Sequence, residues 1–144
     1  LEGKKVKIDT ETENIISLCK IANNGYYAIG EIINLEKLKS SIKVYNNYSE
    51  LIFEDILNAL MIDFYISDNL DYLGCQFANS KDKLYSGLFF LYNINKSKLE
   101  WKNDLGFWHP EKLNIDIDNN CIDLLYEKKK YKYDLNNGNP ITKK

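Results

Sequence analysis

The chain has 144 residues and a formal net charge of −2, and its length fits one domain spanning residues 1–144. All 19 of its basic side chains are lysines. The absence of arginine, which supplies the bidentate fork for phosphates and base edges, argues against nucleic-acid binding. No apolar run of about 18 residues is present, which excludes a transmembrane helix within this sequence.

The first predicted helix covers residues 12–23. Thr10 and Glu13 have the spacing of a capping box, and apolar residues follow them at helical intervals. The tripeptide Asn23-Asn24-Gly25 suits the left-handed end of a helix. We therefore expect one amphipathic helix at this point of the chain.

Two further elements precede the middle of the chain. Tyr26–Ile33 has the composition of a strand, in which Gly30 marks a bulge or a close approach of another group. Leu35–Ile42 predicts a short second helix, with Asn34 as its cap.

The strongest helical pattern begins at Ser49. Its apolar side chains recur three and four positions apart and form one stripe, made of Ile52, Phe53, Ile56, Leu57, Leu60, Met61 and Phe64. Acidic and amide side chains lie off this stripe, and Tyr48 is placed to pack on Phe53 across the cap. We expect this third helix to pack against a sheet.

The C-terminal half predicts an antiparallel meander of short strands. Strand patterns cover Asp71–Ala78, Leu84–Asn95 and Leu99–Trp101, and the second is apolar enough to be a central strand buried on both faces. The predicted fold class is α+β, with this meander packed against two or three N-terminal helices. Two strand–turn units, ending near Trp101 and Ile141, faintly resemble propeller blades, but the chain is too short for a complete propeller.

The clearest local signal is a hairpin in which two alternating runs flank Asn119-Asn120. With these two residues as the loop, Asp116 faces Asp123 and Asp118 faces Cys121. Isoleucine and leucine side chains then form the other face. Directly opposed like charges weaken a strand pair, so this acidic face is self-repelling unless something positive binds to it.

Metal binding is not expected. Residues from Asp116 to Glu127 match part of an EF-hand loop, but Cys121 stands where the loop needs glycine, and strands replace the flanking helices. The other cysteines, Cys19 and Cys75, are far away, and the three together with one histidine lack zinc-site spacing. We expect buried thiols, no disulfide, no metal and no cofactor.

Candidates for catalysis are sparse. His109 is the only histidine, and no orienting motif surrounds it. Asp63, Asp68 and Asp71 group at the predicted end of the third helix and, with the aspartates of the hairpin, leave a carboxylate-dependent hydrolase as an alternative. The main expectation is that the chain is not an enzyme.

Aromatic residues offer a second kind of surface. Trp101 and Trp108 predict either a small core that seals the end of the sheet or an exposed anchor, the residue type that dominates interface energetics. Tyr131 and Tyr133 share one face of the last strand. An exposed set would suit a protein partner or, alternatively, a carbohydrate- or surface-binding accessory domain.

Small, acidic, arginine-free α+β chains resemble, as a class, the immunity proteins that bacteria make against secreted toxins. The resemblance implies a non-enzymatic inhibitor that neutralises a basic partner protein. The predicted partner-binding residues are Asp116, Asp118, Asp123, Trp101, Trp108, Tyr131 and Tyr133. We expect a cytoplasmic protein. Because the chain starts at Leu1 instead of methionine, the alternative is an extracytoplasmic domain that has lost a signal or anchor.

Overall fold

The protein, in a computed structural model, consists of antiparallel β-sheets. The structure describes residues 16–34, 39–77, 88–105 and 110–141. Within these ranges the chain forms eleven strands in three sheets, and no helix. The predicted α+β class, with helices packed on the meander, is therefore wrong. These ranges also contain no helix long and apolar enough to cross a bilayer.

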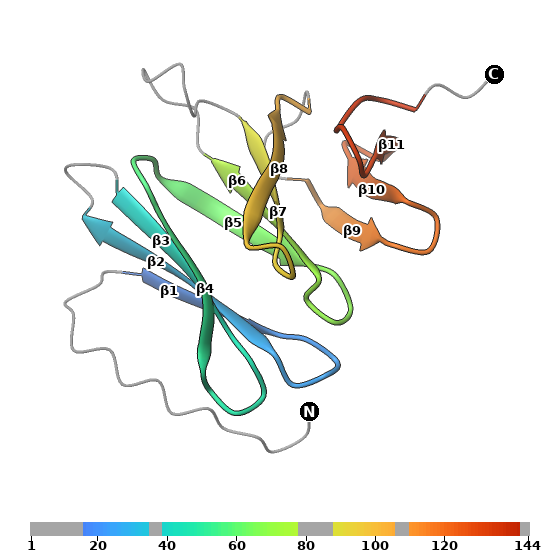
Figure 1. The fold of residues 1–144 in the computed structure, drawn as a ribbon. Helices are drawn as coiled ribbons and strands as arrows, with labels where there is room; N and C mark the ends of the chain where they lie inside the picture. Colours follow the sequence, from blue (N-terminus) through green and yellow to red (C-terminus); the bar gives the residue numbers. More distant parts are fainter. Residues whose placement is uncertain (1–15, 35–38, 78–87, 106–109, 142–144) are drawn as a thin grey trace.

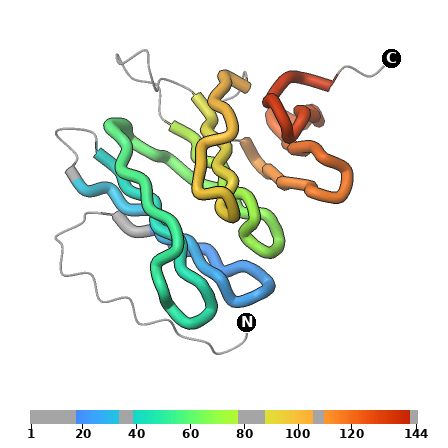
Figure 2. The backbone as a smooth tube through the Cα atoms, in the orientation of Figure 1, coloured from blue at the N-terminus to red at the C-terminus, as the bar shows by residue number. Residues whose placement is uncertain are grey.

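Each sheet is a meander that is complete before the next sheet begins, as the chain path in Figure 1 and Figure 2 shows. Sheet 1 contains β1 (Ile16–Ile21), β2 (Tyr27–Asn34), β3 (Lys39–Tyr45) and β4 (Leu51–Leu57). Sheet 2 contains β5 (Met61–Ile66), β6 (Tyr72–Phe77), β7 (Phe89–Asn93) and β8 (Lys98–Asn103). Sheet 3 contains β9 (Lys112–Asp116), β10 (Cys121–Tyr126) and β11 (Lys129–Asp134).

Most of the described residues of the first two predicted helices form strands. Residues 16–21 form β1 and pair antiparallel with β2. Asn23-Asn24-Gly25, expected to end a helix, instead turns the chain between these strands, and Gly25 has a φ of 86°. Its left-handed conformation serves a hairpin as well as a helix end. The part of Leu35–Ile42 that is described belongs to β3.

The third predicted helix is also wrong, because its residues form β4 and β5. On β4 the buried side chains are Phe53 and Leu57, and the exposed ones include Ile52 and Ile56. This run satisfies both a helical and an alternating pattern. Pairing with β3 and packing on sheet 2 decide between them, since strand preference depends on such neighbours.

Sheet 2 is the middle layer, with sheet 1 on one side and sheet 3 on the other (Figure 1). One core cluster joins sheets 1 and 2 and includes Ala28, Ile42, Val44, Phe64, Leu73, Phe90 and Tyr92. A second joins sheets 2 and 3 and includes Phe89, Leu91, Ile115, Ile122, Leu124 and Tyr133. As expected for a central strand, all five residues of β7 are buried. Each fully buried large apolar side chain contributes about 1.5–3 kcal/mol.

Two glycines allow side chains to approach the backbone closely. A Cβ on Gly30 would lie 2.5 Å from Cε of Met61, which confirms the close approach predicted there. A Cβ on Gly74 would lie 2.1 Å from Cζ of Phe89. Any larger residue at either position must therefore displace a core side chain.

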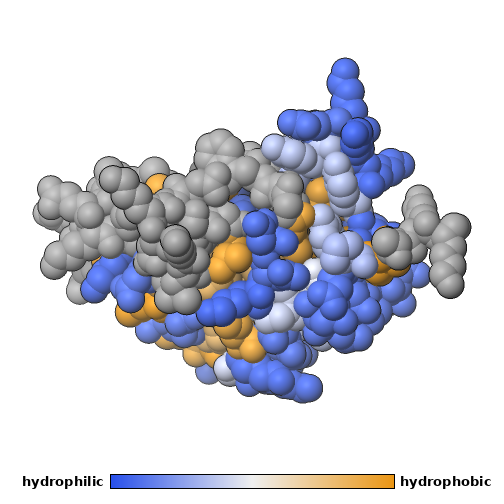
Figure 3. Space-filling view, turned by 90° about the horizontal axis from the view of Figure 1, so that it is seen from above, coloured by the Kyte–Doolittle hydropathy of each residue, from blue (hydrophilic) through white to orange (hydrophobic). Residues whose placement is uncertain are grey.

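The outer face of sheet 3 is a hydrophilic part of the surface. Seen from above in Figure 3, the side where sheet 3 lies is mainly hydrophilic. The register explains this, because the outer face of sheet 3 carries alternate polar and charged residues of its strands: Lys112, Asn114, Asp116, Asp123, Lys130, Lys132 and Asp134. Sheet 3 thus turns most of its apolar side chains toward sheet 2 and most of its charges outward, while Cys121 and Leu125 share the outer face.

Candidate acidic cleft

A cleft of about 420 Å³ lies between the β5–β6 turn and the end of β9 with the turn that follows it. Its lining residues come from two sheets: Asp68, Asn69, Asp71, Asn114, Ile115, Asp116, Ile117 and Asp118. Half of them are aspartates. We call this feature the acidic cleft.

The β5–β6 turn that forms one wall is held by its neighbours. Leu70 is buried and has a φ of 59°, and its N–H donates to the Ser67 carbonyl at 3.0 Å. From the β1–β2 turn, the N–H of Asn23 donates to the carbonyl of Asp68 at 2.8 Å. From the β7–β8 turn, Asn95 Nδ2 donates to Asp71 Oδ1 at 3.0 Å. These bonds fix both aspartates of this wall in place.

The opposite wall owes its shape to Asp116. Its carboxylate accepts hydrogen bonds from Asn119 N at 3.1 Å and from Asn119 Nδ2 at 2.8 Å. These two hydrogen bonds stabilise a four-residue turn over residues 117–120, in which Asn120 has a φ of 53°. An Asx-type bond of this kind replaces a backbone turn.

The longer turn changes the hairpin register. Asp116 pairs with Cys121, and Asn114 pairs with Asp123. The predicted two-residue loop, with Asp116 opposite Asp123, is therefore wrong. Asp118 lies in the turn, at the mouth of the acidic cleft, instead of on the strand face.

The acidic cleft carries an excess of negative charge, which the charge of Lys132 offsets in part near Asp116. Hydrogen bonds from the Asn119 side chain and N–H hold the pKa of Asp116 below its ordinary value. Among the described residues, no lysine forms an ion pair with Asp68, Asp71, Asp116 or Asp118. The ion pairs that exist occupy other carboxylates, including the Lys132–Asp123 pair at 3.7 Å.

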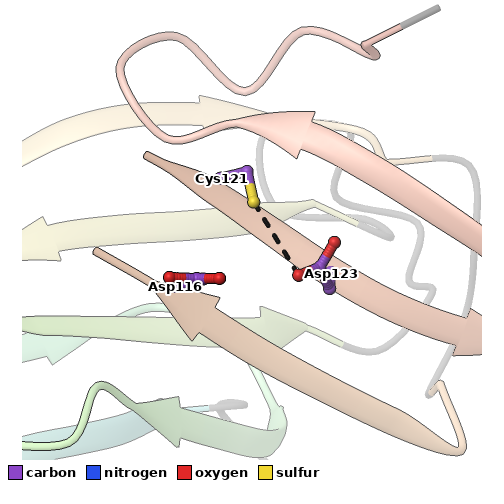
Figure 4. A group of neighbouring side chains, drawn as sticks. All are labelled: Asp116, Cys121 and Asp123. Carbon is purple, nitrogen blue, oxygen red and sulfur yellow. Dashed lines mark hydrogen bonds between the residues drawn. The ribbon is translucent and has the colours of Figure 1, made fainter. Parts of the chain in front are cut away.

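A second cluster lies on the outer face of sheet 3, where Asp116 from β9 meets Cys121 and Asp123 from β10 (Figure 4). One ligand atom of each lies within 4.8 Å of the others, and Cys121 Sγ donates to Asp123 Oδ2 at 3.8 Å. These three could hold a metal ion. Burial and the neighbouring Asp123 raise the pKa of Cys121, so a metal ion would have to displace the thiol proton in order to bind.

The other predicted partner-binding residues are placed differently. Tyr133 is buried and its hydroxyl donates to the Leu105 carbonyl, whereas Tyr131 is 40% exposed. Trp101 donates from Nε1 to the Leu135 carbonyl at 2.8 Å and packs on Phe89, which ties sheet 2 to sheet 3. Trp108 and His109 lie outside the described residues.

The thiols and Asp63 also have definite places. No disulfide forms, since all three cysteines are free. Cys75 and Cys121 are buried as expected, but Cys19 is exposed, so that part of the prediction is wrong. Asp63 does not line the acidic cleft and forms an ion pair with Lys20 of β1 at 3.3 Å.

No family model and no curated protein matches the sequence. Among solved structures, the chain is similar to the crystal structure of Kluyvelomyces marxianus Hsv2, with a TM-score of 0.57 and 7% sequence identity. The fold is propeller-like. Hsv2 is a β-propeller, and the match covers 88% of this chain and 35% of Hsv2. The chain therefore spans about a third of the length of the structure it matches.

The propeller likeness explains the layers. Propeller blades are antiparallel meanders stacked face to face. The three sheets of this chain are arranged in the same way, and the first strand of sheet 2 contacts the first strands of sheets 1 and 3. The two strand–turn units noted in the sequence correspond to sheets 2 and 3. Sheet 1 went unrecognised because only β2 was predicted as a strand, at Tyr26–Ile33, whereas the residues of β1, of the first part of β3 and of β4 were expected to be helical.

Proposed function

We propose that the chain is a non-enzymatic protein-binding module that takes a basic segment of a partner protein in the acidic cleft. The observation that carries this proposal is the convergence of four aspartates without a described lysine in an ion pair with any of them: two from the β5–β6 turn, one from the end of β9 and one from the turn that follows it. Lysine or arginine side chains of a partner would form ion pairs with these carboxylates. Complementary charge of this kind favours fast association and selects against acidic partners.

As the resemblance to immunity proteins implies, binding would neutralise a toxin-like partner in the cytoplasm. The acidic cleft adds Asp68 and Asp71 to the predicted contacts. It leaves Asp123, which is paired with Lys132, in a lesser role. Tyr131 is the exposed aromatic residue that remains available for such a contact.

The test uses three proteins as baits: the wild type, a cleft variant and a matched control. The cleft variant carries Asp68→Asn and Asp118→Asn. The control carries Glu111→Gln and Glu127→Gln, which change net charge equally at exposed positions outside the acidic cleft, just before β9 and in the β10–β11 turn. We expect a basic protein to be retained at physiological salt by the wild type and the control, and the cleft variant to bind it about tenfold more weakly.

Neutralisation is tested separately, by co-expression of the recovered partner. Growth arrest by the partner should be relieved by the wild type and by the control, and not by the cleft variant. If all three baits recover the same proteins equally, the acidic cleft is not the binding site. If a partner binds but its activity is unaffected, the neutralising role is wrong.

The alternatives make different demands on the same residues. A carboxylate-dependent hydrolase should turn over a member of a broad substrate panel and lose that activity when Asp68 or Asp118 becomes asparagine. A carbohydrate-binding domain should show a tryptophan fluorescence change with a glycan panel. Trp101 is packed between sheets 2 and 3, so this alternative would depend on Trp108.

A further inference from the structure

The edge of sheet 1 formed by its last strand, β4, differs from the edges formed by the last strands of sheets 2 and 3, β8 and β11. The last strands of sheets 2 and 3 carry lysines: Lys98 and Lys102 on β8, and Lys129, Lys130 and Lys132 on β11. Lysines on an edge strand discourage pairing with another chain. The last strand of sheet 1, β4, has the sequence LIFEDIL and contains none.

Exposed apolar side chains follow this lysine-free edge. Leu51 is 51% exposed, Ile52 is 37% exposed and Ile56 is 58% exposed, and Tyr48 in the preceding turn is 78% exposed. Ile52 and Ile56 lie on the same side of the strand, with Glu54 between them. The outward side of β4 thus presents an apolar, an acidic and an apolar side chain in succession.

Hydrogen bonds and packing fix the conformation of β4 and of the turn before it. Asn46 Oδ1 accepts from Tyr48 N at 2.9 Å and from Glu50 N at 3.0 Å, which fixes the β3–β4 turn. On the inward side, the Tyr92 hydroxyl donates to Asp55 Oδ2 at 2.7 Å, and the ring of Tyr92 packs edge-on against Phe53 at 5.3 Å. A strand that is already ordered loses little entropy when a partner pairs with it.

Charge decides which partner fits. Residues 50–57 contain Glu50, Glu54 and Asp55, and the only described cation paired with them is Lys43, at 3.7 Å from Glu54. If two copies of β4 paired antiparallel with Ile52 against Ile56, Glu54 would meet Glu54 of the other copy. Opposed like charges weaken such a pairing. A lysine opposite Glu54 would strengthen it.

We propose that β4 is a docking edge for an extended segment of another protein, which adds as a fifth strand to sheet 1 and places an apolar, a lysine and an apolar residue against Ile52, Glu54 and Ile56. Main-chain hydrogen bonds would supply affinity and the alternate side chains specificity, as in other cases of strand addition. This edge belongs to sheet 1, whereas the acidic cleft lies between sheets 2 and 3, so the two sites are independent.

The test is an NMR titration of the isotopically labelled protein with two heptapeptides. The probe is acetyl-Thr-Val-Thr-Lys-Thr-Val-Thr-amide, and the matched peptide has glutamate in place of lysine. We expect saturable amide shifts in β4 and residues 46–50 with the lysine peptide, and about tenfold weaker binding of the glutamate peptide. The Glu54→Lys variant should reverse this preference.

Two control variants separate the docking edge from the rest of the molecule. Leu99→Lys alters a 39% exposed residue on the lysine-bearing edge of β8, and it should leave binding unchanged. The cleft variant, with Asp68→Asn and Asp118→Asn, should also bind the lysine peptide as the wild type does. Failure of the cleft proposal would therefore leave this one standing, and the reverse holds too.

Several results would overturn the proposal. Equal binding of the two peptides would show that Glu54 selects nothing, and absence of saturable shifts in β4 would show that the edge does not accept a strand. Shifts spread equally over β8 or β11 would point to nonspecific pairing. Shifts in β4 that grow with protein concentration alone would assign the edge to a second copy of the chain.

Discussion

Lys20 on β1 lies with its Nζ 3.3 Å from Asp63 Oδ1 on β5, and so joins the first strands of sheets 1 and 2. The same ammonium group lies 4.8 Å from the ring centre of Tyr65 and 5.1 Å from that of Phe64. It also donates a hydrogen bond to the Phe64 carbonyl. One side chain therefore combines an ion pair, a backbone bond and cation–π contacts across the junction of two sheets.

Replacing Lys20 by methionine should destabilise the protein. The aliphatic stem is retained, but the contacts of the ammonium group are lost. Because the pair is partly exposed, we expect the free energy of unfolding to fall by only about 1 kcal/mol. Urea denaturation measures the change. Lys98→Met, which removes an ion pair within one sheet, is the control and should change the free energy of unfolding by less than about 0.5 kcal/mol. Equal losses in the two variants would show that the contacts of Lys20 between the sheets add no stability beyond that of a surface ion pair.

Gly74→Ala should be strongly destabilising, because the new methyl group would overlap the ring of Phe89. Phe89 is buried and packs on Trp101 and Tyr65, so its ring has little room to move. We expect a loss of about 1–3 kcal/mol in urea denaturation. In the double variant with Phe89→Leu, the combined loss should be smaller than the sum of the single losses, since the clash is removed. Additive losses would contradict this contact.

Asp116 should contribute to the acid dependence of stability. Hydrogen bonds from Asn119 lower its pKa in the folded state, so the stabilisation is present above the unfolded-state pKa and is lost as pH falls through the folded-state pKa. In an NMR titration of the Asp116 carboxyl carbon, the Asn119→Ala variant should show the pKa moving back up toward the ordinary value. A pKa that does not move would show that another group sets it.

The three thiols should react in a fixed order with iodoacetamide. Burial raises the pKa values of all three, but only Cys19 is exposed. We expect Cys19 to be alkylated first, and Cys75, within the first core cluster, to react only after unfolding. Peptide mass spectrometry after timed labelling identifies the modified residue. Labelling of Cys75 in the native protein at a rate comparable to Cys19 would contradict the packing of sheets 1 and 2.

The sequence predicted the C-terminal half well, because its strands alternate clearly and are separated by asparagine- and glycine-rich turns. The strands around Leu91 and Ile122 lie where they were expected. In the N-terminal half the strand predicted at Tyr26–Ile33 is confirmed by β2, but the three predicted helices were wrong, the third because the run from Ile52 to Phe64 fits two periodicities at once. Only pairing across strands, which joins residues distant in sequence, distinguishes the two.

The residues of the acidic cleft, but not their arrangement, could be picked out from the sequence. Asp116 and Asp118 stood out in the sequence, and Asp68 and Asp71 were noticed as a group of carboxylates. Nothing in the sequence placed these two groups opposite each other, because their proximity arises from the stacking of sheet 3 on sheet 2. The hairpin register was missed because the bond from Asn119 to the Asp116 side chain lengthened the turn.

Every hydrogen-bonded pair of strands in the described part of the chain joins consecutive strands. Each sheet can therefore close its own pairings without waiting for a distant segment, which limits the loop-closure entropy that each pairing costs. In evolution, duplication of one meander would add a layer to the stack without rethreading the chain. Sheet 2, which is covered on both faces, should be the last to exchange its amide protons.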